Sequence, residues 1–239
     1  MKMRGPDGDG TPQPLLAQMF TPGLLIKNDL TLHRVQRFVV QANAAAVPTF
    51  MDYRDQMLES SNQGSTSQCA AYAVAGFVEW LNWRYNGVRA QVDPNPIYAE
   101  AKAIDGFPDV AGTTLEAAVT AATHLQLLSI DIGSMRCVRD AADVKRALHR
   151  YGPVIAGFSI TSGWQSPTAD GWITPGGNVL GGHGVVITGY SDLTSEPSYV
   201  GVQNSWGDNS YGWNGFCRMS PAQFEAEFSY ALVFDSSVA

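Results

Sequence analysis

The stretch that decides both fold and chemistry is NQGSTSQCAAY, residues 62–72. Small, polar and turn-forming residues lead into Cys69, and apolar side chains then recur at intervals of three and four residues. This spacing predicts a helix over residues 68–85, with Ser67 as its N-cap and Gly87 as its stop. Unpaired N–H groups and the positive helix end stabilise an anion at such a position, so we expect a lowered thiol pKa. Cys69 is therefore the candidate nucleophile.

Helical patterns continue to about residue 150 and then give way to short strands. Three more helices are expected, opening at Asn95-Pro96, at Thr113 in a capping box with Glu116, and at Asp140. The β-branched or aromatic runs that predict strands are residues 154–160, 184–190, 199–204, 216–219 and 231–234, with a short helix at 221–228. A helical half followed by a strand-rich half predicts an α+β protein with a cleft between two lobes.

Composition narrows the possible partners. The 239 residues carry a net charge of -7 without any Lys/Arg run, so no nucleic-acid partner is expected. No apolar stretch reaches the roughly 18–20 residues that span a bilayer, which predicts no membrane partner. Three cysteines form no disulfide framework, and Cys137 and Cys217 are interpreted as structural. Residues 5–10, GPDGDG, stand where a signal peptide would be apolar, so no export signal is recognised and the compartment is left open.

A nucleophilic thiol needs a base, and the best placed of the four histidines is His183. It lies in GGHG directly before an apolar strand, where flanking glycines allow close approach of a substrate. Asn204 ends a later strand in the run NSWG, and its amide oxygen would accept the second ring N–H of a histidine. Trp206 would cover that bond from water, and the Gln63 amide with the Cys69 backbone N–H would form an oxyanion hole.

Four motifs in this order resemble those of the papain family of cysteine peptidases. They are DYR at 52–54, NQG…C at 62–69, GHGV…GY at 182–190 and NSWG…GWNGF at 204–216. The resemblance covers about residues 47–235. It implies a papain-like two-lobed fold, with a helical lobe over about 60–150, a β-barrel-like lobe over about 151–235, and the active-site cleft between them.

The resemblance also implies the reaction. A Cys69 thiolate paired with protonated His183 would attack a peptide bond of a peptide or protein substrate, with Asn204 as orienter and without a cofactor or metal. Thr66 stands where the family has a cysteine, and Ala70 where it has an aromatic residue. The family's glycine pair beside the substrate is absent. Gly112 and Thr113 are predicted to supply its backbone hydrogen bonds, and Trp206 is grouped with them as substrate-binding.

Residues 1–46 are expected to be an N-terminal extension before a peptidase domain at 47–239. Within it, residues 15–46 precede the family's mature start, which suggests a short pro-like segment that covers the cleft as an inhibitor of its own chain. Three other functions stay open at this point: acyl transfer, hydrolysis of a non-protein amide, and a catalytically silent interaction module.

Overall fold

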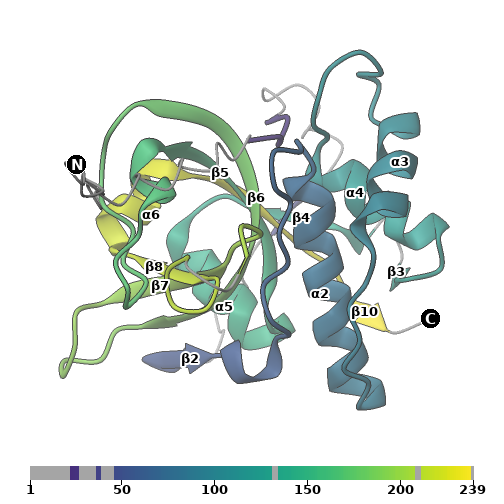
Figure 1. Cartoon of the computed structure of the whole chain (residues 1–239). Coiled ribbons are helices and arrows are strands. Elements are labelled where there is room, and N and C mark those ends of the chain that lie inside the picture. The colour runs from purple at the N-terminus through teal and green to yellow at the C-terminus, as the bar shows by residue number, and fades with distance from the viewer. Residues whose placement is uncertain (1–21, 27–35, 39–45, 131–133, 208–210, 238–239) are drawn as a thin grey trace, which may run out of the picture.

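The computed structural model describes residues 22–26, 36–38, 46–130, 134–207 and 211–237 (Figure 1). Most of the expected extension, residues 1–46, lies outside these ranges. The described helices are α2 (Cys69–Asn86), α3 (Pro94–Ile104), α4 (Leu115–His124), α5 (Ala141–Tyr151) and α6 (Pro221–Glu227), with short 3-10 turns η1 (Arg54–Gln56) and η3 (Ser162–Gln165). The strands are β1 (Gln36–Arg37), β2 (Phe50–Asp52), β3 (Ser129–Ile130), β4 (Arg136–Val138), β5 (Val154–Thr161), β6 (Val179–Ser191), β7 (Tyr199–Gln203), β8 (Phe216–Met219), β9 (Phe228–Val233) and β10 (Ser236–Ser237).

Helices α2, α3 and α4 gather on one side of the molecule, at the right of Figure 1. The expected helices are all present, but their caps differ from the prediction. The N-cap of α2 is Gln68 rather than Ser67, and its side chain makes no capping bond. The N-cap of α3 is Asp93, two residues before the predicted Asn95. Helix α4 is capped by Thr114, whose hydroxyl accepts from the Ala117 N–H, so the predicted capping box is wrong.

The main sheet has the order β1-β4-β9-β5-β6-β7-β8, with β2 added to β6. All its described pairings are antiparallel except that of β1 with β4. Strand β6 begins five residues earlier than predicted. His183 therefore lies within the strand, opposite Phe158 of β5, rather than before it. Helix and antiparallel sheet in these proportions confirm the predicted α+β class.

Helix α2 packs against β6, and this contact brings the two chemical motifs together. Gly184 makes the close approach possible, because a Cβ there would lie 3.1 Å from the Ala70 Cα. One apolar cluster surrounds α2, α3 and α4, and a second joins α5 and α6 to the sheet. None of the helices in the described ranges is both long and apolar enough to cross a membrane.

Candidate active site

Cys69 begins α2 and is completely buried. The backbone N–H groups of Gly184, from the opposite strand, of Gly23, from the N-terminal segment, and of Ala70 and Cys69 itself each favour the thiolate. Burial nevertheless raises the pKa of the Cys69 thiol, and these N–H groups lower it less. The lowered pKa expected from the sequence is therefore not found in this arrangement. The helix end is placed as predicted, but the N-terminal segment excludes water from the sulfur.

His183 is held by Asn204, as the sequence predicts. Its Nε2 lies 2.7 Å from Asn204 Oδ1, and both side chains are buried. The Trp206 ring covers the pair, with its centroid 4.8 Å from that of the imidazole. The other ring nitrogen, Nδ1, is buried without a hydrogen-bond partner. Burial lowers the pKa of His183 to about 4, and the bond to Asn204 opposes this shift.

Gln63 is fixed at both ends of its amide. Its Oε1 accepts from the Ser205 hydroxyl at 2.6 Å, and its Nε2 donates to the Thr66 carbonyl at 2.7 Å. The Gln63 backbone N–H also donates to the Ser205 carbonyl at 2.8 Å. The loop before α2 is thus tied to the residue that follows Asn204, so the candidate oxyanion donor is positioned from the sheet side.

Segment Pro22–Ile26, the covering segment, lies between the two predicted walls of the cleft. The Leu24 N–H donates to the Gly182 carbonyl at 2.9 Å. On the other wall, the Thr113 N–H donates to the Gly23 carbonyl, and the Thr113 carbonyl accepts from the Leu25 N–H. The backbone of Thr113, which was predicted to bind a substrate, here bonds the covering segment.

Glycines let the covering segment approach both walls closely. A Cβ on Gly112 would lie 2.0 Å from the Gly23 carbonyl oxygen. A Cβ on Gly182 would lie 2.2 Å from the Leu24 carbonyl oxygen. The Leu24 side chain is buried beside Gly157, with Leu115 and Tyr230 close by. This apolar pocket beside the site was not predicted.

The sequence-based account misses three side chains that complete the site. Ser205 holds Gln63, Tyr211 accepts a bond from Asn204 at 2.9 Å, and Trp164 stands edge-on to the His183 ring at 6.0 Å. Ser205 and Tyr211 lie inside or beside the NSWG…GWNGF motif, so their position in the motif was an available signal. Trp164, in η3, has no such signal, because it reaches the site only through the fold.

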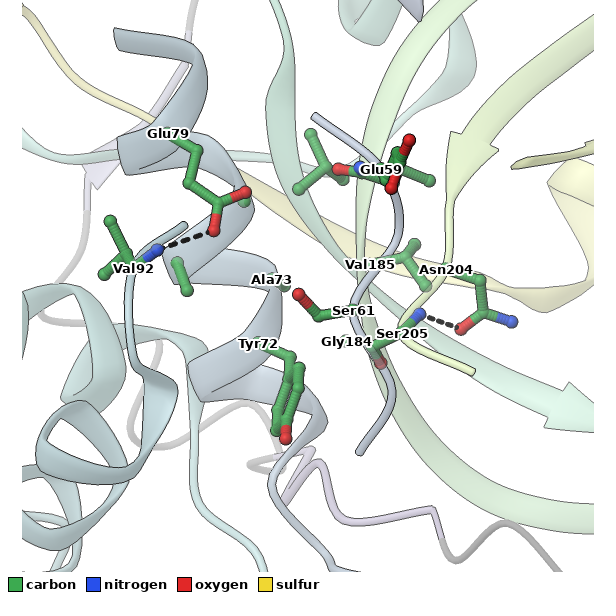
Figure 2. A pocket seen from close by; sticks show the side chains of 14 residues that line it. Glu59, Ser61, Tyr72, Ala73, Glu79, Val92, Gly184, Val185, Asn204 and Ser205 are labelled. Atoms are coloured by element: carbon green, nitrogen blue, oxygen red, sulfur yellow. Dashed lines mark hydrogen bonds between the residues drawn. The ribbon is translucent and has the colours of Figure 1, made fainter. Parts of the chain in front are cut away.

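A small pocket with a mostly apolar lining lies between α2 and β6, and Asn204 is among the residues that line it (Figure 2). Its volume of about 20 Å³ has room for one water molecule. The Glu79 carboxylate of α2 lines it and accepts from the Val92 N–H at 2.8 Å. Burial raises the pKa of Glu79 to about 7, opposed by that bond. Glu79 is thus a buried ionisable carboxyl group on the helix that begins at Cys69.

Metal chemistry has no evident ligands in the part of the chain that the structure describes. There, no group of three or more His, Cys, Asp or Glu side chains is arranged to hold a metal ion. The three cysteines, all within the described ranges, form no disulfide and are buried. The functional groups of the candidate site are therefore one thiol, one imidazole and two side-chain amides.

Comparisons with known proteins agree with this arrangement. A family model described as "Papain family cysteine protease" matches residues 112–232, just over half of the chain, which include His183 and Asn204. No curated protein sequence gives a significant match.

Several solved structures share the fold. Xylellain, a cysteine protease from Xylella fastidiosa, is 18% identical with a TM-score of 0.74, over 92% of this chain and 96% of that one. ProCathepsin B S9 from Trypanosoma congolense is 14% identical with a TM-score of 0.70, over 91% and 87%. Digestive procathepsin L2 from Tenebrio molitor larval midgut is 20% identical with a TM-score of 0.65, over 93% and 80%.

Because these sequence identities are low, the structural matches show only the fold, which is a papain-like α+β fold. The family model adds the relationship in sequence over the half of the chain that carries His183 and Asn204. The chain therefore belongs to the papain family of cysteine proteases.

Proposed function

We propose that this protease cleaves peptide bonds with Cys69 as nucleophile and His183 as acid and base. The observation that carries the proposal is the state of His183. Its Nε2 is held by Asn204 at 2.7 Å under Trp206, while Nδ1 is buried without a partner. The backbone N–H of the next residue, Gly184, favours the Cys69 thiolate, so the residue with the unpartnered ring nitrogen adjoins one that acts on the thiol. A base needs one nitrogen held and the other free for proton transfer.

The proposed reaction proceeds in two halves. The Cys69 thiol gives its proton to His183 Nδ1, and the thiolate adds to the scissile carbonyl carbon. The carbonyl electron pair moves to oxygen, where the Cys69 N–H and the Gln63 amide stabilise it. When the oxyanion collapses, the C–N bond breaks and Nδ1 protonates the leaving amine. Water then attacks the thioester, gives a proton to Nδ1, and the C–S bond breaks to release the acid and the thiolate.

The test compares variants of the cysteines of the chain. Cys69→Ala should abolish cleavage of a peptide library and of any single peptide found with it. Cys137→Ala should retain cleavage, because Cys137 lies in β4, which strands β9 and β5 separate from the strand of His183. Cys217→Ala is not a neutral control, because its thiol lies beside the Tyr211 hydroxyl that bonds Asn204. Mass spectrometry after iodoacetamide treatment should locate the inactivating label on Cys69. Undiminished cleavage by Cys69→Ala would refute the nucleophile.

The covering segment is proposed as an inhibitor within the same chain. It buries Cys69, bonds to Gly182 and Thr113, and fills an apolar pocket with Leu24. It presents the Gly23 N–H to the sulfur, whereas attack requires a carbonyl carbon there. The segment therefore blocks the nucleophile without being placed for cleavage at Gly23. The pocket that receives Leu24 would take an apolar side chain of a peptide substrate once the segment leaves.

A further inference from the structure

The hydrogen bonds that hold His183 do not end at Asn204. The Asn204 Nδ2 group donates to the Tyr211 hydroxyl at 2.9 Å, and that hydroxyl donates to the Trp164 carbonyl at 2.5 Å. Asn204, Tyr211 and Trp164 are all buried. The result is a linear chain of bonds from the imidazole to a backbone carbonyl in η3.

The direction of this chain is fixed by its last member. A carbonyl oxygen only accepts, so the single proton of the Tyr211 hydroxyl points to Trp164. The hydroxyl must then accept from its other neighbours, the Cys217 thiol and the Asn204 amide, and only the NH₂ end of that amide can donate to it. At the opposite end of the amide, the Ser205 N–H donates to Oδ1 at 2.8 Å. Both contacts orient the amide oxygen toward His183.

The surroundings keep Tyr211 in place and protonated. Its ring stands edge-on to Trp206, with centroids 5.2 Å apart. Burial raises the pKa of Tyr211 well above its usual value, so the hydroxyl keeps its proton. The Cys217 thiol lies beside the same hydroxyl, and burial raises the pKa of Cys217 to about 12, so it stays neutral. The side chain of Trp164 is held as well, because its Nε1 donates to the Glu227 carboxylate at 2.6 Å.

We propose that Tyr211 is a positioning residue of this protease, one that locks the Asn204 amide and so places the His183 proton on Nε2. Neutral His183 then offers an unprotonated Nδ1 to Cys69, and protonated His183 is stabilised by the Asn204 oxygen. Tyr211 acts through Asn204 and does not contact the reacting atoms. This inference rests on the proposed roles of Cys69 and His183.

Tyr211→Phe removes the hydroxyl and keeps the ring. Without its acceptor, the Asn204 NH₂ group is unpaired, and the amide gains a rotated state that turns NH₂ toward the imidazole. We expect kcat to fall about tenfold with KM unchanged. The alkaline limb of the pH–rate profile should move to lower pH by roughly half a unit to one unit, because the imidazolium loses part of its acceptor.

Tyr190→Phe is the matched control. Tyr190 is equally buried, and its hydroxyl also donates to a backbone carbonyl at 2.5 Å, that of Pro48, but at the far end of β6. It should lower thermal stability by a similar amount and leave the alkaline limb in place. An equal shift of the limb in both variants, or no shift in Tyr211→Phe, would overturn the positioning role.

A double-mutant cycle tests whether Tyr211 acts through Asn204. In an Asn204→Ala background, Tyr211→Phe should change kcat less than twofold. A further tenfold loss would show that Tyr211 acts by another route. Should Tyr211→Phe not fold, wild-type NMR carries the test. The Asn204 side-chain NH₂ protons should show nuclear Overhauser contacts to the Tyr211 ring, and contacts to the His183 ring instead would overturn the proposal.

These outcomes are separable from failure of the proposed function. If Cys69→Ala cleaves peptides as well as the wild type does, the catalytic roles are wrong whatever Tyr211→Phe does. If Cys69→Ala is inactive and Tyr211→Phe matches the wild type in kcat and pH profile, only the role of Tyr211 is refuted.

Discussion

The base side of the site is made of His183, Asn204 and Tyr211. Consecutive hydrogen bonds join these three side chains within one lobe. The nucleophile side, made of Cys69 and Gln63, lies at the start of α2, and there the covering segment contributes the Gly23 N–H to the sulfur. One side is thus completed by the sheet itself, and the other by a piece of chain that is distant in sequence.

The difference predicts which step controls activity. With the segment in place, burial raises the pKa of Cys69 and lowers that of His183 to about 4, so both groups are neutral. A thiolate–imidazolium pair needs water or substrate dipoles near the sulfur. Because the side-chain hydrogen bonds described for His183 and Asn204 do not involve the segment, removing the segment should change the nucleophile and leave the orientation of His183 intact.

The largest expected effect on kcat comes from replacing Gln63, the residue that joins the two sides through its bond to Ser205. Gln63→Ala should lower kcat by roughly 10²–10³-fold, because it removes one oxyanion donor. Gln63→Glu keeps the shape and an acceptor for the Ser205 hydroxyl, but it replaces the amide donor with a carboxylate. It should be as defective as Gln63→Ala while unfolding at a similar temperature. A Gln63→Glu variant within a few-fold of wild-type kcat would remove Gln63 from the oxyanion hole.

The next largest effect should come from releasing the covering segment, which is expected to change the nucleophile side and not the base side. Leu24→Asp places a charge in the apolar pocket beside Gly157 and should release the covering segment. Burial of a leucine is worth about 1.5–3 kcal/mol, so kcat/KM and the rate of Cys69 alkylation should both rise about 10–100-fold. Ile26→Asp, at a residue 36% exposed in the same segment, should give a much smaller rise. Unchanged kinetics with a lower melting temperature would instead mark the segment as scaffold.

Much of the fold was accessible from the sequence because its signals are local. Apolar spacing after Cys69, Pro at the start of α6 and Gly152 after α5 mark elements that the structure places within a few residues of the prediction. The errors fall at helix caps, at the starts of β6 and β9, and at the short strands β1 to β4 and β10, which were not predicted. At β6, pairing with β5 extends the strand past its apolar run.

The candidate site was only partly predictable, for a physical reason. Gln63, His183 and Asn204 stand in motifs whose spacing carries information, and the structure bonds His183 to Asn204 and Gln63 to the next residue, Ser205. The burial of Cys69 could not be foreseen, because it depends on where residues 22–26 return to the fold. Trp164 likewise enters through the pairing of β5 with β6.

The smallest expected effect concerns the pH dependence of stability. Two buried groups, Glu79 of α2 and His183 of β6, should change the free energy of unfolding in opposite directions with pH. The His183 pKa falls from 6.5 to about 4 on folding, so the folded state loses stability as pH drops through that window. The Glu79 pKa rises from 4.5 to about 7, so its contribution is complete below pH 4.5 and is lost as pH rises toward 7. Between pH 4.5 and 6.5 the two slopes oppose each other.

Glu79→Gln should expose the His183 slope by removing the opposing one. Measured by urea unfolding in a Cys69→Ala background, which prevents self-cleavage, the variant should equal its parent near pH 4 and exceed it at pH 8 by at most about 3 kcal/mol. Glu225→Gln, at an exposed carboxylate of α6, should run parallel to the parent at every pH. If the difference in unfolding free energy between Glu79→Gln and its parent does not grow with pH, water reaches Glu79 between α2 and β6 and lets it ionise at its usual pKa. The pocket beside Asn204 would then be open to solvent, and the isolation of the base side would have to come from Trp206 and Tyr211 alone.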